Sequence, residues 1–174
     1  SNPFITIYKR SGDTFTKLPN PTDLPAGDSY GAAFDPTGVY LAIAHAGSPY
    51  VTIYKHDGDS FTKLSAPAGG NPASTGRGVA FDSTSTYLAV AHDTSPYLTI
   101  YKRSGDTFTK LSNPTDLPTG NGWGVSFAPS NQYPTNYVTG VYTPSSLDVR
   151  KIKVAVFTNN PLATVKVKDI HMYE

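Results

Sequence analysis

The sequence predicts an all-β protein made of repeated four-stranded antiparallel units, and three observations support this fold class. Two sequence blocks recur together at a period of 46 or 47 residues. Turn residues separate short apolar runs inside each copy, as expected for hairpins. The 174 residues include 15 Gly, 15 Pro and 12 Tyr, a composition that favours short strands and frequent turns over helices.

The first block ends each time in TIYK, a turn and FTKL, and its copies begin at Pro3, Pro49 and Pro96. The second block reads GVAFDSTSTYLAVAH in its middle copy, and its copies begin at Gly31, Gly78 and Gly124. The conserved spacing of the two blocks shows that one structural unit is repeated. A period in the mid-forties is slightly above the usual length of a four-stranded propeller blade.

Four strands are predicted in each unit, over Gly78 to Phe81 in one copy and over Tyr40 to His45, Val51 to Lys55 and Ser60 to Leu64 in another. Asp35-Pro36-Thr37-Gly38 has the residue order of a type I turn. Val51 and Ile53 alternate with Thr52 and Tyr54, so neither face of that strand is strongly polar. This pattern is expected when sheets stack face to face.

The GxxFDxTxxYLAxAH block followed by PYxTIYK resembles the WD40-like and YVTN-type β-propeller family over about residues 3 to 130. Ile-Tyr-Lys stands where WD40 repeats end in Trp-Asp. The near-identity of the outer copies is also similar to repeat proteins of bacteriophage virions and bacterial cell surfaces. The resemblance implies propeller blades, and a virion or extracellular location.

Residues 1–130 are therefore predicted to hold about two and a half blades in a permuted frame that begins at a third strand. Residues 131–174 are predicted to form a C-terminal β segment, either a degenerate last blade or a separate small β element. Closed propellers usually have four to eight blades. We expect the chain to associate with itself, to belong to a longer propeller, or to be closed by its own C-terminal segment. Its start at Ser1 is compatible with either a natural N-terminus or a fragment.

Charge and composition exclude several partners. The formal net charge is +1 and charged residues make up 16% of the chain, so no strong field would attract nucleic acid or an anionic membrane. No apolar run approaches the length of a membrane span. The chain has no cysteine, which excludes disulfides and thiolate chemistry. We therefore expect neither a nucleic-acid nor a membrane partner.

No local pattern indicates catalysis. His45 and His92 occupy the same position in two units, but only His92 is followed by an acidic residue, Asp93. We interpret both as strand-end histidines that bond to a loop. The acidic Gly turns, such as Asp57-Gly58-Asp59, offer too few carboxylates for calcium. The sequence thus predicts no catalytic residues, no metal, no cofactor and no enzymatic activity.

One position differs between the units while its neighbours repeat. Its residues are Tyr30, Arg77 and Trp123, each followed by glycine. Tyr, Arg and Trp are enriched in interface hot spots, and aromatic faces suit sugar stacking. We predict that these three residues bind a ligand at one rim of the repeats. The alternative is that they fill the central channel or cap the packing of the blades.

The function predicted from these patterns is a non-catalytic binding module that contacts a protein or a glycan in a virion or extracellular assembly. One alternative is a purely structural repeat protein whose faces are covered by its own copies. A second alternative is a fragment of a propeller hydrolase or lyase, because such enzymes take their catalytic residues from different blades and leave no local motif.

Overall fold

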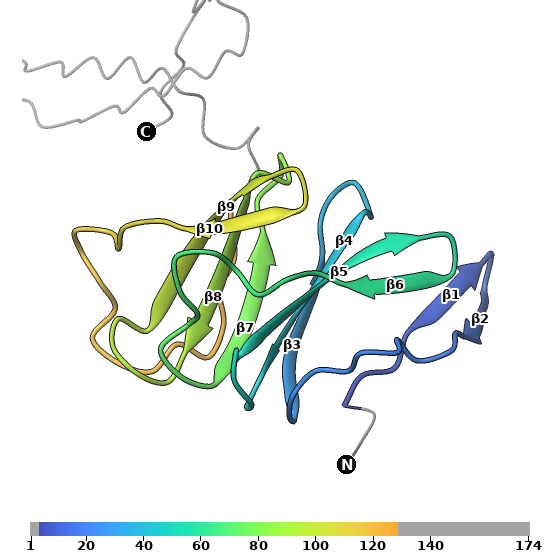
Figure 1. Cartoon of the computed structure of the whole chain (residues 1–174), viewed down its shortest axis with the longest axis horizontal. Coiled ribbons are helices and arrows are strands. Elements are labelled where there is room, and N and C mark those ends of the chain that lie inside the picture. The colour runs from blue at the N-terminus through green and yellow to red at the C-terminus, as the bar shows by residue number, and fades with distance from the viewer. Residues whose placement is uncertain (1–3, 129–174) are drawn as a thin grey trace, which may run out of the picture. The chain divides into compact units, whose positions relative to one another are not determined.

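The computed structural model describes residues 4–128, so the predictions for residues 131–174 lie outside the described residues. The described part contains ten β-strands and no helix (Figure 1). A two-stranded hairpin comes first, followed by two four-stranded sheets. The strands are β1 Tyr8–Ser11, β2 Thr14–Lys17, β3 Ser29–Phe34, β4 Tyr40–His45, β5 Val51–Asp57, β6 Ser60–Lys63, β7 Gly76–Phe81, β8 Tyr87–His92, β9 Leu98–Ser104 and β10 Thr107–Lys110.

Each four-stranded sheet is an antiparallel meander in which every strand pairs with the next one along the chain. Their orders are β3-β4-β5-β6 and β7-β8-β9-β10. The registers match between the sheets, since Ala42 pairs with Ile53 in the first and Ala89 with Ile100 in the second. These sheets have the architecture of propeller blades, and the predicted fold class is confirmed. We call them blade 2 (β3–β6) and blade 3 (β7–β10).

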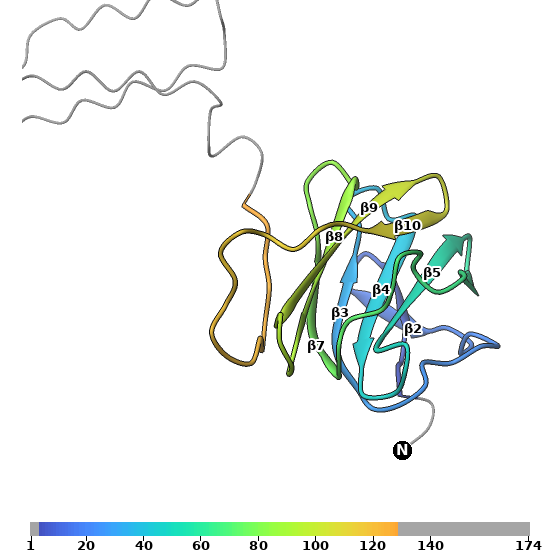
Figure 2. The ribbon, with the colours of Figure 1, turned by 60° about the vertical axis from the view of Figure 1, so that its left-hand side comes forward.

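One of the two core clusters lies between the two blades and is built mainly from their middle strands, and the other lies between blade 2 and the N-terminal residues. Every residue of β4 is buried, as are the first four residues of β5. Ala42, Ala44, Val51 and Ile53 from blade 2 join Val79, Leu88 and Val90 from blade 3 in one apolar cluster. Strand β7 lies beside β3 in both views (Figures 1 and 2). Both faces of these middle strands are covered, and this explains why their sequences have no polar face.

Small residues let the first strands of successive units approach closely. A Cβ atom on Gly31 would lie 3.1 Å from the Cα of Gly78, and one on Gly78 would lie 2.7 Å from the Cα of Gly124. Residues 122–128 thus stand beside β7 as β7 stands beside β3. They belong to no strand ladder within the described residues, although the sequence predicts the first strand of a further unit there. A strand assignment needs a hydrogen-bonded neighbour, and the residues that follow are outside the described range.

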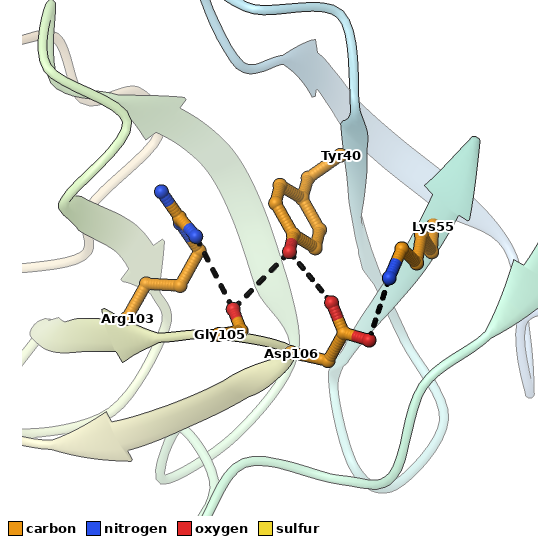
Figure 3. Close-up of polar contacts among 5 residues, drawn as sticks. All are labelled: Tyr40, Lys55, Arg103, Gly105 and Asp106. Carbon is orange, nitrogen blue, oxygen red and sulfur yellow. Dashed lines mark hydrogen bonds and ion pairs between the residues drawn. The ribbon is translucent and has the colours of Figure 1, made fainter. Parts of the chain in front are cut away.

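A polar network joins blade 2 to the hairpin turn of blade 3 (Figure 3). The Tyr40 hydroxyl donates to the carboxylate of Asp106 at 2.6 Å and to the carbonyl of Gly105 at 3.1 Å. Lys55 pairs with the other oxygen of Asp106 at 2.8 Å. The guanidinium carbon of Arg103 lies 4.9 Å from the Tyr40 ring centroid. Bonds from Lys55 and Tyr40 lower the pKa of Asp106.

Replacing Tyr40 with phenylalanine removes both hydroxyl bonds and leaves the ring in place. We expect the free energy of unfolding to fall by about 1 kcal/mol, the usual net value of a partly solvated hydrogen bond. Urea denaturation measures the change. Tyr50→Phe is the matched control, because the Tyr50 hydroxyl is in no hydrogen bond recorded within residues 4–128. Equal losses in the two variants would contradict a role for the network.

The N-terminal hairpin β1–β2 is the outer half of a further blade, which we call the half-blade (residues 4–17). Its Tyr8 and Phe15 are 56% and 64% exposed. The equivalent tyrosines, Tyr54 and Tyr101, are fully buried, and the equivalent phenylalanines, Phe61 and Phe108, are 9% and 3% exposed. In blades 2 and 3 the first two strands cover these rings, and within residues 4–128 the half-blade has no such strands.

Candidate functional site

The position that varies between the units lies on a β-bulge at the start of each first strand. In β3 the pairing passes from Ser29 with His45 to Gly31 with Ala44, and Tyr30 is left without a partner. In β7 the same shift leaves out Arg77. A bulge redirects the side chain of the unpaired residue and strengthens the local twist. The side chains of Tyr30 and Arg77 therefore do not follow the regular alternation of side-chain directions along their strands.

The three residues predicted to bind a ligand come together in the structure. The guanidinium carbon of Arg77 lies 4.4 Å from the ring centroid of Tyr30 and 5.0 Å from that of Trp123. Both distances are within the range of a cation–π contact. Tyr30 is 49% and Trp123 69% exposed. We call this surface of Tyr30, Arg77 and Trp123 the rim platform.

Asp93 fixes the Arg77 side chain at the platform. Nε of Arg77 donates to both carboxylate oxygens, at 2.9 and 3.0 Å, and Nη2 donates to Oδ2 at 2.6 Å. Bonds from Arg77 lower the pKa of Asp93, and bonds to Asp93 raise the pKa of Arg77. This fork-to-fork geometry orients the plane of the guanidinium. The platform thus presents a fixed cation, a carboxylate and two aromatic rings.

Sequence reasoning found Tyr30, Arg77 and Trp123 but did not connect Arg77 with Asp93. The signal was present, because both residues depart from the first unit at equivalent positions. That unit has Tyr30 in place of Arg77 and Ala46 in place of Asp93. A paired change of an arginine and an aspartate between two copies of a repeat indicates an ion pair. Whether the platform binds a ligand stays a prediction.

The repeated histidines are buried parts of the sheets, and His92 directly precedes Asp93 of the platform's ion pair. Nε2 of His45 is 2.9 Å from Oγ1 of Thr52, and Nε2 of His92 is 3.0 Å from Oγ1 of Thr99. Both threonines are on the next strand. Burial lowers the pKa of both histidines. Each ring is therefore held in its neutral form within a blade.

A second feature is an apolar cleft of about 420 Å³ between the half-blade and β3. It is lined by Ile5 and Ile7 on one side and by Ala32, Phe34 and Leu41 on the other, with Tyr30 also on its wall. Few polar side chains converge on it. Residues 4–128 contain no group of three or more His, Asp or Glu side chains that could hold a metal ion. No helix long and apolar enough to cross a membrane occurs in the same range.

The fold was compared with known proteins. No protein-family model matches the chain, and no curated protein matches it. A solved structure with the same fold is the putative 6-phosphogluconolactonase from Bacteroides fragilis, with a TM-score of 0.56 and 17% sequence identity. The similarity covers 71% of this chain and 35% of that one, so the chain spans about a third of the length of that protein.

This similarity supports blade architecture and corrects the functional interpretation of the sequence. The structure that shares the fold is described as an enzyme, so the prediction of a non-catalytic module for protein or glycan contact is wrong as the first interpretation. The alternative of a propeller hydrolase or lyase agrees better with the comparison. The sequence could not rank this alternative first, because a propeller site is assembled from several blades and leaves no local motif.

Proposed function

We propose that the chain forms blades of a propeller hydrolase and that the rim platform binds a phosphorylated sugar derivative. The observation that carries the proposal is the convergence of Tyr30, Arg77 and Trp123 at one bulged position of successive units. The similarity to the Bacteroides fragilis protein supports the hydrolase class, and its name supplies the substrate class. Membership of the WD40-like or YVTN-type family, and a virion or extracellular location, stay predictions.

The chemistry of the platform fits an anionic sugar. A guanidinium binds phosphate through a planar set of five N–H donors. In Arg77, Nε and Nη2 face Asp93, so Nη1 is the nitrogen that would face the ligand. Asp93 accepts hydrogen bonds, as a sugar hydroxyl requires, and the exposed Trp123 ring offers an apolar surface to a pyranose. A neutral sugar would forgo the contact with Nη1.

Binding can be measured through Trp123, because the chain has a single tryptophan. We expect glucose 6-phosphate to change its fluorescence in a saturable way, and Arg77→Gln to weaken this binding at least 10-fold, about 1.4 kcal/mol. Glucose should bind more weakly than its phosphate. Arg103→Gln is the matched control, since Arg103 also stacks on a tyrosine but lies outside the platform. Equal affinities of the wild-type and Arg77→Gln chains would refute the role of Arg77.

The hydrolase class is tested separately by the hydrolysis of 6-phosphogluconolactone, followed as acid release at constant pH. We expect a rate above the spontaneous one that falls in the Arg77→Gln chain. A rate equal to that of the buffer blank would contradict the hydrolase class and would favour the sequence prediction of no enzymatic activity. The binding measurement would then show whether the platform alone is correct.

A further inference from the structure

The ion pair of Arg77 and Asp93 at the rim platform is largely shielded from solvent. Its two side chains are 23% and 22% exposed, whereas both side chains of the Lys55–Asp106 pair are 46% exposed. Charges that are less hydrated interact more strongly with a neighbouring ion. The carboxylate of Asp93 would therefore act on an anion bound at the platform, as the guanidinium of Arg77 would.

Arg77 and Asp93 carry opposite charges, so the pair attracts an anion much less than a lone arginine would. His92 also acts on Asp93, but burial lowers the pKa of His92 and keeps its ring neutral. The unit before it has Tyr30 and Ala46 at the equivalent positions and so has neither charge. Attraction by net charge therefore does not make the platform a site for every anion.

The hydrogen bonds within the pair determine which polar positions remain for a ligand. Oδ2 of Asp93 accepts from both Nε and Nη2 of Arg77, and Oδ1 accepts from Nε alone. A carboxylate oxygen has about two lone-pair sites, so Oδ1 keeps one position for a further donor. Nη1 of Arg77 takes no part in this pairing. A ligand at the platform would thus meet N–H donors at Nη1 and an acceptor at Oδ1.

These two positions distinguish anions that carry a hydrogen-bond donor from anions that carry none. A sugar phosphate can place its phosphate at Nη1 of Arg77 and one of its hydroxyls at Oδ1 of Asp93. Sulfate carries about the same charge as a sugar phosphate at pH 8, about two negative charges, but it has no hydrogen to donate. Its oxygens would approach the carboxylate without a hydrogen bond and would be repelled by it. A site that accepts a hydrogen bond from its ligand rejects an analogue that lacks the donor.

We propose that Asp93 is the specificity-determining residue of the rim platform: it accepts anions that also donate a hydroxyl hydrogen, and it rejects anions that do not. This inference rests on the proposed function, because it concerns the ligand of the same surface. It gives Asp93 a role beyond holding the guanidinium of Arg77. The two roles have opposite consequences. If Asp93 only held Arg77, replacing it would weaken the binding of every anion, whereas a residue that rejects sulfate should, when replaced, allow sulfate to bind more tightly.

Replacing Asp93 with asparagine separates these roles, because asparagine has the same shape, no charge and an amide donor. The full chain is titrated at pH 8 and constant ionic strength with sodium sulfate and, separately, with glucose 6-phosphate. Binding is followed through the fluorescence of Trp123, the single tryptophan. We expect Asp93→Asn to bind sulfate at least about 10-fold more tightly than the wild type, and its preference for glucose 6-phosphate over sulfate to fall by at least the same factor.

Asp59→Asn is the matched control, because it also removes one negative charge from an ion pair, and that pair with Lys9 lies outside the platform. Its affinity for sulfate should equal that of the wild type. Asp93→Ser, which also replaces the charge with a donor, should show the same gain as Asp93→Asn and provides a second folded chain, checked by circular dichroism.

Sulfate binding by both Asp93 variants that is equal to or weaker than that of the wild type would overturn the proposal and leave Asp93 only a support for Arg77. The proposed function fails in a different way. If glucose 6-phosphate does not bind the wild-type chain while sulfate binds Asp93→Asn more tightly, the sugar ligand is wrong and the rejection of sulfate by Asp93 is supported.

Discussion

Replacing Gly76 with alanine is expected to lower the free energy of unfolding by about 3 kcal/mol, at the upper end of the usual cost of overpacking. A Cβ atom on Gly76 would overlap the carbonyl oxygen of Tyr50 and would lie 3.1 Å from the Cβ of Ala44. Both contacts belong to the neighbouring blade, and the closer one is backbone, which cannot move aside as a flexible side chain can. Blades 2 and 3 would have to separate.

Urea denaturation of the full chain measures this loss, with circular dichroism as the signal. Gly120→Ala is the control, because a Cβ atom at that position would meet no atom within 4 Å. We expect the control to stay within about 0.5 kcal/mol of the wild type. A Gly76→Ala chain as stable as the control would show that the two blades are less closely packed in solution.

Acidification from pH 7 to pH 5 is expected to destabilise the chain through His45 and His92. Burial lowers the pKa of both rings below the ordinary histidine value of 6.5. In the unfolded chain they take up protons near pH 6.5, whereas in the folded chain they take up protons only at a lower pH. Stability is therefore complete above pH 6.5 and is lost as the pH falls below it, with a slope of at most about 1.4 kcal/mol per pH unit for each histidine.

The measurement is the free energy of unfolding in urea at several pH values between 7 and 5. The double variant His45→Gln/His92→Gln should show a flatter dependence, whatever its absolute stability. Asp35 and Asp82 do not contribute to the change in stability between pH 7 and pH 5. Burial alone would raise the pKa of each carboxyl, but hydrogen bonds lower it below its ordinary value. These bonds come from Thr37 and Tyr40 to Asp35, and from Thr84 and Tyr87 to Asp82. Their contribution is lost only as the pH falls below 3.8. An unchanged slope in the double variant would contradict the assignment to the histidines.

The sequence predicted the blades well because each strand leaves a local pattern. The strand Tyr40–His45 was predicted with its correct bounds, since the turn Asp35 to Gly38 comes just before it and small residues alternate along it. The first strands begin earlier than predicted, at Ser29 and Gly76, because a bulge interrupts the pairing. Nothing in a Gly-Arg-Gly triplet shows a bulge before the partner strand is known.

The candidate site was predicted in part. Equivalent positions in the repeat placed Tyr30, Arg77 and Trp123 on one rim, and the structure brings them into contact. The Arg77–Asp93 pair depends on the curvature of two strands, which a repeat alignment does not give. The unequal burial of Tyr8 and Tyr54 could not be predicted from the sequence either. The two tyrosines occupy equivalent positions in the repeat, and their burial differs only because different parts of the chain pack against them.

The ion pairs Lys9–Asp59 and Lys55–Asp106 join equivalent residues of successive units, and this recurrence has a consequence for how such a chain can change in length. Each repeat unit carries both the lysine and the aspartate of this ion pair. An added unit would therefore find its pairing residues on both neighbouring units without any further substitution. Tandem duplication of a single gene segment is then immediately compatible with folding. Growth by whole units would therefore be favoured over growth by parts of a unit.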